Sequence, residues 1–230
     1  LLKENKDQIS QKSYEDVAKF VIYKFYLISV DGYFKSELSN IPPKFKIKKY
    51  SELEREEKDT FENMYQKHDD SKSDFFSSLN SIIHEDCLTI SVDSNTVLKE
   101  HITIININEN YDVNNYRKMI FCDKGSEISI FERFINLKSD ENFSSSVTEI
   151  YQAENSKLNY YSTQDFKENY HYNSINVFQK RDSVSNFFTV SFSGSIVRNN
   201  LNICLHDKSC YTNMYGCLLY TSDAADDDVR

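Results

Sequence analysis

Glycine is scarce in the second half of the sequence, although that half alternates apolar and polar residues as β-strands do. After Cys87 the chain contains only Gly125, Gly194 and Gly216. The tight hairpins that join neighbouring antiparallel strands need residues with positive φ angles, and glycine is a main supplier of them. Three glycines are too few for a meander of such hairpins, so another kind of connection must return the chain.

Long apolar runs and an excess of basic residues are also missing. The longest apolar stretch, around residues 20–30, is broken by Lys24 and Ser29, which excludes a transmembrane helix and a membrane partner. The net charge is −9, and it is −6 for the residues before Thr221. Binding to a nucleic-acid backbone needs a basic face, so nucleic acid is excluded as a partner.

The cysteines lack the spacing of a metal-binding or redox motif. They are five in number and show no CxxC pair: Cys87, Cys122, Cys204, Cys210 and Cys217. An odd, scattered set favours free thiols in a reducing compartment over a disulfide framework. We therefore expect a cytoplasmic protein.

The N-terminal part of the chain, residues 1–84, combines helix signals with one hairpin signal. Residues 7–20 have the spacing of a weak amphipathic helix, and Asp31-Gly32 is typical of a type I′ hairpin turn. Ser51 and Glu54 form a capping-box pattern ahead of a charged helix that reaches about His68. These residues predict a small α+β N-terminal region.

The stretch "FFSSLNSII" (75–83) predicts a short helix after Ser73 and Asp74, which are candidate N-caps. Its apolar residues recur at helical spacing, and they are expected to face the core: Phe75, Phe76, Leu79, Ile82 and Ile83.

From Cys87 onward the apolar period changes from 3.6 to 2, and strand follows strand without helices between them. Comparable segments start near Arg117, Ser146, Tyr172 and Ser195, so they recur at a loose but similar interval. This pattern fits a parallel β-helix, and it fits a β-sandwich equally well. Asparagine is abundant together with Lys, Ile, Tyr and Phe, as an AT-rich genome would produce, so this abundance carries little weight as a sign of an asparagine ladder.

Five phrases, in order, carry a resemblance to a known family. They are "LISVDGYFKSELS" (27–39), "FFSSLNSIIHEDCLTISV" (75–92), "RKMIFCDKGSEISIFERF" (117–134), "SSVTEIYQAENSKLNYYSTQ" (145–164) and "GSIVRNNLNICLHDKSCYTNMYG" (194–216). With them the chain resembles the family that SufB and SufD share in the SUF iron-sulfur cluster assembly system. The hairpin and helix ahead of a strand-rich half favour SufD over SufB.

The resemblance implies a mainly β fold: a right-handed parallel β-helix core over residues 85–216, preceded by the N-terminal region of residues 1–84. It also implies a non-catalytic scaffold of the SufBCD complex, which pairs with SufB through the β-helix and with the SufC ATPase through a C-terminal helical domain. The iron-sulfur cluster is handled by the full complex. The family's cluster ligands belong to a later segment, so this chain is expected to bind no cofactor directly.

Two groups of residues suggest chemistry of their own. Cys204 and His206 are expected on the outward face of one strand, with Cys210 nearby, which is a candidate metal site without the spacing of a compact Cys/His motif. Glu132 and Glu149 are a candidate acid/base pair of a carbohydrate-cleaving β-helix. In both groups the interpretation as ordinary structural residues is preferred.

Other polar residues are weaker candidates. Arg198, with Asn199 and Asn200, could clamp a partner's carboxylate, although turn chemistry explains the asparagines equally well. The remaining histidines form no catalytic phrase: His68, His84, His101 and His171. We assign no catalytic, cofactor-binding or metal residue. The alternative functions are a SufB-like paralogue or, in another class, an extracellular β-helix enzyme or adhesin.

The last residues differ from everything before them. "CLLYTSDAADDDVR" (217–230) turns abruptly to small and acidic residues, whereas the resemblance stops at Gly216. The stretch reads like a translated sequencing adapter or, alternatively, a disordered acidic tail. We expect the chain to be a fragment of a longer protein, cut at both ends.

Overall fold

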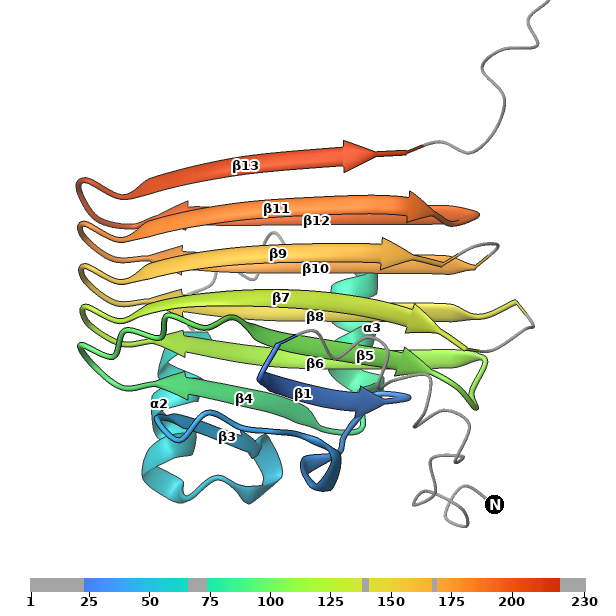
Figure 1. Cartoon of the computed structure of the whole chain (residues 1–230), viewed down its shortest axis with the longest axis horizontal. Coiled ribbons are helices and arrows are strands. Elements are labelled where there is room, and N and C mark those ends of the chain that lie inside the picture. Colours follow the sequence, from blue (N-terminus) through green and yellow to red (C-terminus); the bar gives the residue numbers. More distant parts are fainter. Residues whose placement is uncertain (1–22, 66–73, 138–140, 167–168, 220–230) are drawn as a thin grey trace, which may run out of the picture.

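Two facing β-sheets, with antiparallel pairing only of β2 with β1 and of β3 with β4, form the body of the protein in a computed structural model, which describes residues 23–65, 74–137, 141–166 and 169–219 (Figure 1). Sheet A has the order β13-β11-β9-β7-β5-β1-β2 and sheet B the order β12-β10-β8-β6-β4-β3. The strands are β1 (Phe25–Val30), β2 (Tyr33–Phe34), β3 (Phe45–Lys49), β4 (Cys87–Val92), β5 (Ile102–Asn108), β6 (Val113–Cys122), β7 (Glu127–Asn136), β8 (Phe143–Gln152), β9 (Lys157–Asp165), β10 (Tyr170–Gln179), β11 (Val184–Ser193), β12 (Ile196–Leu205) and β13 (Tyr211–Leu218). The helices are η1 (Ser36–Leu38), η2 (Tyr50–Glu52), α2 (Arg55–Tyr65) and α3 (Phe75–Ile83).

From β4 onward the chain alternates between the sheets, so each coil adds one strand to each sheet and stacks on the coil before it (Figure 1). In sheet B, Val113 pairs with Phe143, Phe143 with Tyr170, and Tyr170 with Ile196, so the first residues of four successive strands lie in one column. This arrangement confirms the predicted parallel β-helix and rules out the β-sandwich.

One corner of each coil explains why so little glycine suffices. Where a sheet-B strand turns toward sheet A, one residue has a positive φ angle: Asn95, Gly125, Asn155, Asp182 and Ser209. The backbone N–H of Asn95, Gly125, Asn155 and Asp182 donates to a carbonyl of the next coil, at 2.8 to 3.2 Å. Asparagine and aspartate tolerate this conformation better than most residues, so a single glycine serves five turns.

Aliphatic side chains stack along the interior of sheet B. Ile90, Ile120, Ile150, Val177 and Ile203 occupy paired positions on β4, β6, β8, β10 and β12. The first four are at most 1% exposed. Burial of a side chain of this size contributes about 1.5–3 kcal/mol, so the column is a main source of stability.

The N-terminal strands complete the first coil. Asp31 and Gly32 have φ angles of 51° and 86° between β1 and β2, which confirms the predicted hairpin turn. A Cβ atom on Gly32 would lie 2.3 Å from the carbonyl oxygen of Asn115, so no other residue fits there. Strand β1 pairs with β5 in sheet A, and β3 pairs with β4 in sheet B. The boundary at residues 84 and 85 stays a prediction, but strands from both sides of it share the two sheets.

The predicted capping box at Ser51 and Glu54 is wrong. Ser51 lies in the short helix η2, and its hydroxyl donates to Asp86 Oδ2 at 2.7 Å instead of capping a helix. Helix α2 begins at Arg55, and Glu57 accepts the N–H of Glu54 at 3.0 Å. His68 and the predicted helix of residues 7–20 lie outside the described residues.

Helix α3 forms where the sequence predicts it, but only Phe76 of the five predicted apolar residues packs on rings of sheet B, and the most exposed ones face away from it. Asp74 is the N-cap and accepts the N–H of Ser77 at 3.0 Å. The face toward sheet B is polar and buries Ser77 and Asn80. Phe75 and Ile82, expected in the core, are 73% and 81% exposed. The polar face has hydrogen-bond partners on the sheet, which decides the orientation.

An asparagine ladder runs along the outer face of sheet A, although composition alone was given little weight as a sign of it. Asn213 donates to Asn186 and Asn186 to Asn159, each at 2.8 Å, and Asn159 donates to Ser129 Oγ at 3.0 Å. The four residues occupy paired positions on β13, β11, β9 and β7. Stacking of the coils places these three asparagines in line.

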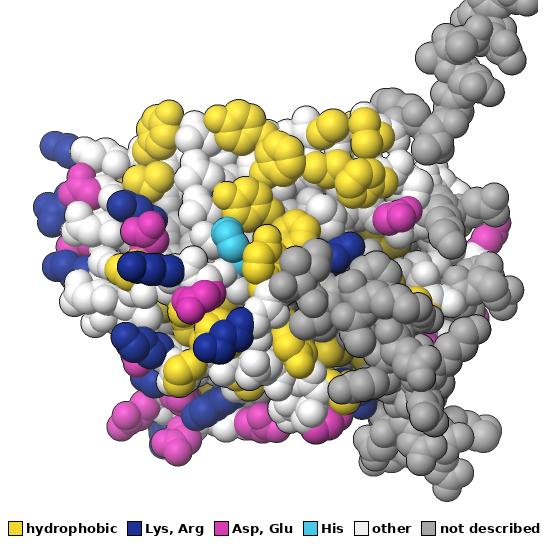
Figure 2. All heavy atoms as spheres, in the orientation of Figure 1, with side chains coloured by type: hydrophobic (Ala, Val, Ile, Leu, Met, Phe, Trp, Pro, Cys, Tyr) yellow, Lys and Arg dark blue, Asp and Glu magenta, His cyan; other side chains and the backbone are white. Residues whose placement is uncertain are grey.

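Hydrophobic side chains gather over the upper strands of this same face (Figure 2). Two residues beyond the ladder, paired positions hold an aromatic column of Phe131, Tyr161, Phe188 and Tyr215.

Cys217 and Leu218 end β13, and residues 220–230 lie outside the described part, so the identity of residues 217–230 stays a prediction.

Candidate functional site

Strand β6 directs two consecutive cations to opposite sides of sheet B. Arg117 points outward, and its Nη2 lies 2.6 Å from Glu149 Oε1. Lys118 points into the β-helix, where its Nζ lies 2.8 Å from Glu132 Oε1. All four side chains are at most 8% exposed. Alternation along the strand therefore creates two separate buried ion pairs.

The inner pair is the centre of a hydrogen-bonded cluster. Glu132 accepts from Tyr160 Oη at 2.6 Å and from Asn106 Nδ2 at 2.7 Å, and Lys118 donates to Ser146 Oγ at 3.0 Å. Burial, followed by the neighbouring Glu132 carboxylate, raises the pKa of Tyr160 well above its ordinary value. A buried ion pair persists when such additional bonds offset the loss of hydration.

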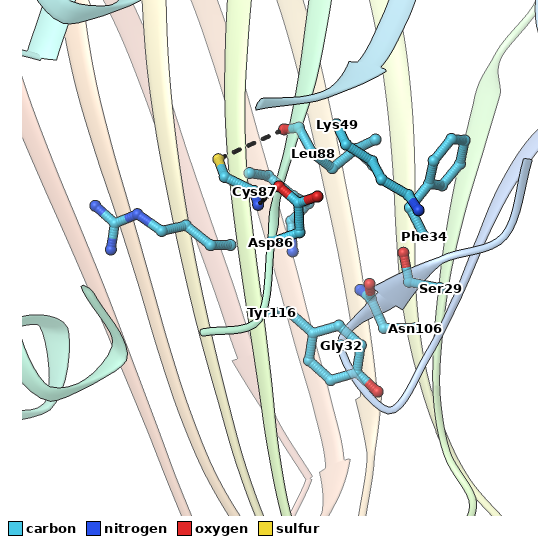
Figure 3. A pocket seen from close by; sticks show the side chains of 11 residues that line it. Ser29, Gly32, Phe34, Lys49, Asp86, Cys87, Leu88, Asn106 and Tyr116 are labelled. Carbon is cyan, nitrogen blue, oxygen red and sulfur yellow. Dashed lines mark hydrogen bonds between the residues drawn. The ribbon is translucent and has the colours of Figure 1, made fainter. Parts of the chain in front are cut away.

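The interior beside this cluster is too small for a substrate. Figure 3 shows Ser29, Asn106 and Tyr116 close to Gly32 of the hairpin turn. The cavity that they line with Lys118 has a volume of about 10 Å³. Such a space holds roughly one water molecule.

His171 is a second buried titratable group in the interior. Its ring stacks on Phe166 and approaches Phe134, with centroid distances of 4.1 and 4.6 Å. Ser144 Oγ lies 2.6 Å from its Nδ1. Burial, and then the charge of Lys118, lowers the pKa of His171 to about 3. The imidazole is therefore neutral at physiological pH.

The outer pair lines a groove of about 320 Å³ between sheet B and the helices on its outer face, bordered by Tyr50, Glu62, Ser81, His84, Cys87, Arg117, Met119 and Glu149. Burial raises the pKa of the Cys87 thiol to about 12. Because the thiolate is the reactive form, Cys87 is no nucleophile at neutral pH. Arg117 is held by Glu149 and by Ser81 Oγ at 2.8 Å.

The geometry contradicts the interpretation of Glu132 and Glu149 as an acid/base pair. Glu132 points into the β-helix, whereas Glu149 lies on the outer face of sheet B, so they share no cleft. Each carboxylate is paired with its own cation. A glycosidase needs both carboxyl groups on either side of one scissile bond, and this arrangement does not provide that.

Cys204, His206 and Cys210 do not converge on one point. Cys204 is exposed on β12, while the His206 ring packs on Phe178 with a centroid distance of 4.8 Å. Cys210 Sγ lies 3.2 Å from the carbonyl oxygens of Lys180 and Asp207. Within the described ranges, no group of three His, Cys, Asp or Glu side chains is arranged to hold a metal ion.

Arg198, Asn199 and Asn200 also divide between two sides of a strand. Arg198 lies 3.5 Å from Asp74, and Asn200 donates to the same carboxylate at 2.7 Å. Asn199 bonds to Gln164 at 2.7 Å instead. Arg198 and Asn200 thus fix the start of α3, and the three residues do not form a common clamp.

The other described histidines have structural contacts. The Nδ1 of His84 lies 2.9 Å from the carbonyl oxygen of Asn80. His101 contacts the rings of Tyr23 and Tyr161, at 5.0 and 6.2 Å between centroids.

Sequence reasoning missed the inner cluster, although the sequence holds a signal for it. Lys118 alternates in phase with the inward-facing Ile120, and Glu132 alternates in phase with Ile130. A cation and an anion at inward positions of neighbouring strands predict a buried pair, because neither charge is stable alone in a core.

Comparison with known proteins identifies the family. The family model described as "SUF system FeS cluster assembly, SufBD core domain" matches residues 104–227, more than half of the chain. A search of curated proteins found no match. No helix in the described ranges has the length and apolar character to span a membrane. The chain therefore belongs to the SufBD family and has a role in iron-sulfur cluster assembly by the SUF system.

Proposed function

We propose that this chain is a SufD-type, non-catalytic scaffold subunit of a cytoplasmic SufBCD complex. The observation that carries the proposal is that the two best candidates for catalytic residues are buried in ion pairs, with no room for a substrate beside the inner pair. Glu132 and Glu149 lie in separate ion pairs, and the cavity beside the inner pair is about 10 Å³. A rigid β-helix with inert interior groups suits a subunit that presents surfaces to partners.

The partners follow from the family. A SufB-like subunit pairs through the β-helix, and a SufC-like ATPase joins the complex through the C-terminal helical domain that SufBD proteins carry. The iron-sulfur cluster is the cargo of the complex. The hairpin at Asp31-Gly32 and helix α3 ahead of the β-helix support the SufD type.

Co-expression tests this assignment. The full-length product of the gene is tagged and expressed with the SufB-like and SufC-like proteins of the same genome. We expect all three to purify together at constant stoichiometry. A chain that binds neither protein would refute the scaffold proposal. A chain that assembles with a SufD-like protein, and not with SufB, would be the SufB-type paralogue.

A further inference from the structure

The outer face of sheet A is a packing surface where the first coils lie. Ile105 and Ile107 of β5 alternate with the inward-facing Ile104 and point outward, yet both are 0% exposed. They form a hydrophobic cluster with Ile28 of β1, and Leu38 of η1 packs against it. Residues that precede the β-helix in the sequence therefore help to cover this face at its lower end.

The same face becomes exposed farther along the stack, where hydrophobic side chains gather over the upper strands (Figure 2). In the aromatic column, Phe131 and Tyr161 are partly buried, whereas Phe188 and Tyr215 are 41% and 58% exposed. The rings of Phe188 and Tyr215 lie 6.3 Å apart between centroids. Exposed apolar rings in a row cost solvation free energy, and a contiguous apolar patch marks a surface that packs against something.

The described part of the chain begins at the lower end of the aromatic column. The ring of Tyr23 meets that of Phe131 edge to face, at 6.4 Å between centroids, and lies 5.0 Å from that of His101. The His101 ring in turn lies 6.2 Å from the ring of Tyr161. Residues 1–22 are therefore joined to the β-helix on the outer face of sheet A, beside the two lowest rings of the column.

The segment ahead of Tyr23 has the sequence of an amphipathic helix over residues 7–20. Four of its apolar residues fall on one side of a helix with 3.6 residues per turn: Ile9, Tyr14, Val17 and Phe20. Gln8, Lys12 and Lys19 fall on the opposite side. A helix of this length is marginal in water by itself, so it needs an apolar surface to pack on.

The dimensions of the segment and of the column agree. From Phe131 to Tyr215 the column crosses three strand spacings, roughly 14 Å. Ile9 and Phe20 are about 16.5 Å apart along a helix. Only residues 21 and 22 separate Phe20 from the packed ring of Tyr23, so the helix has to start close to the lower end of the column.

We propose that residues 7–20 form a helix that packs its apolar side along the aromatic column, with Phe20 near Phe131 and Ile9 near Tyr215. The position of Tyr23 and the length of the segment carry this assignment. The aromatic column is then an internal contact of this chain, and it is not a surface that binds a second protein.

Hydrogen exchange measured by mass spectrometry tests the contact in the full-length gene product. The amides of residues 7–20 should exchange at least about tenfold more slowly than those of a free peptide of residues 1–22, because only the packed helix is stable. Phe188→Glu, at a half-exposed position of the column, should remove most of this protection. The matched control is Phe75→Glu, which changes an exposed phenylalanine of α3 on sheet B and should leave the protection unchanged.

Substitutions in the segment test the same contact from its other side. Val17→Glu should remove the protection, whereas Gln8→Glu adds the same charge on the polar side and should keep it. Circular dichroism and melting temperatures confirm that each variant is folded. Tyr215→Glu, at a more exposed position, replaces Phe188→Glu if that variant does not fold.

Three results would overturn the proposal. The first is a segment that exchanges as fast in the whole chain as in the free peptide. The second is protection that survives the substitutions in the column, and its loss in Phe75→Glu instead would place the segment on α3. The third is protection that rises with protein concentration over about a hundredfold range while sedimentation velocity shows a dimer, because a second copy would then cover the column.

Discussion

Lys118 and Glu132 form an ion pair of 2.8 Å inside the β-helix, with side chains that are 3% and 0% exposed. Lys46 and Asp93 form a pair of the same length on the surface, with side chains that are 58% and 56% exposed. The inner pair also has hydrogen bonds from Tyr160 and Asn106 to Glu132, whereas the pair of Lys46 with Asp93 is exposed to solvent. Comparison of the two pairs therefore shows what a buried, hydrogen-bonded ion pair contributes in this fold beyond an exposed one.

Glu132→Gln should destabilise the protein by about 3–5 kcal/mol, because Lys118 is then left charged in an apolar interior. Asp93→Asn should change the free energy of unfolding by less than about 1 kcal/mol. Urea unfolding of both variants at pH 7 checks the comparison. Replacement of both inner partners, as Lys118→Met with Glu132→Leu, should recover most of the loss. Equal effects of the two single substitutions would show that the inner pair is hydrated.

The folding stability should fall as the pH drops below about 6.5, because of His171. Burial lowers its pKa in the folded protein to about 3, whereas the unfolded chain takes up the proton near pH 6.5. The unfolded state therefore binds more protons between these values, and stability rises with pH there. From pH 7 to pH 5 this single group should remove about 2 kcal/mol.

His171→Phe removes the titration while it keeps an aromatic ring between Phe134 and Phe166. Between pH 7 and pH 5 the variant should lose less of its free energy of unfolding than the wild type does, because the unfolded variant takes up no proton at this position. Denaturant unfolding at several pH values measures both slopes. Parallel curves for the variant and the wild type would contradict the burial of a neutral imidazole.

Helix α3 should depend on its polar face for stability. Asp74→Ala removes the acceptor for the Ser77 N–H, the Tyr172 hydroxyl and the Asn200 amide, so we expect a loss of about 2 kcal/mol. Ile82→Ala, at an exposed position, should stay within about 0.5 kcal/mol when measured on the monomer. The reverse order of effects would mean that the apolar face is the buried one.

Helix α3 also shows which features could be predicted from the sequence alone. Asp74 as N-cap and the extent of the helix were predictable, since both depend on residues within one turn. The buried face of the helix was not predictable, because apolar spacing reveals an apolar stripe but does not show whether that stripe faces the core or the solvent. The deciding partners, Tyr172 and Asn200, are 98 and 126 residues away from Asp74 in the sequence.

The choice between a β-helix and a β-sandwich could not be made from local sequence patterns either. Alternation is identical in both folds, and the resemblance to a known family, not the period, favoured one of them. The asparagine ladder depends on the register between coils. Local composition carries no information on this register. The abundance of asparagine was therefore visible in the sequence, but not its alignment on successive coils.

The asparagine ladder should add measurable stability. Asn186→Ala breaks the bonds to Asn159 and Asn213, each 2.8 Å long, and we expect a loss of about 1–2 kcal/mol. Thr163→Ala, on the same face but outside the ladder, is the control. Thermal unfolding of both variants measures the difference. Equal melting temperatures for the two variants would show that water replaces the ladder bonds without loss.

Cluster assembly should not depend on Cys204, His206 or Cys210, because these side chains do not converge on one point. In a triple variant with Cys204→Ser, His206→Gln and Cys210→Ser, the co-purified complex should form clusters at the wild-type yield. Anaerobic reconstitution with iron and sulfide checks this through visible absorption and through the iron and sulfide content. Gel filtration of the same sample shows whether the complex is intact. Loss of the cluster from an intact complex would assign these residues a direct role as ligands.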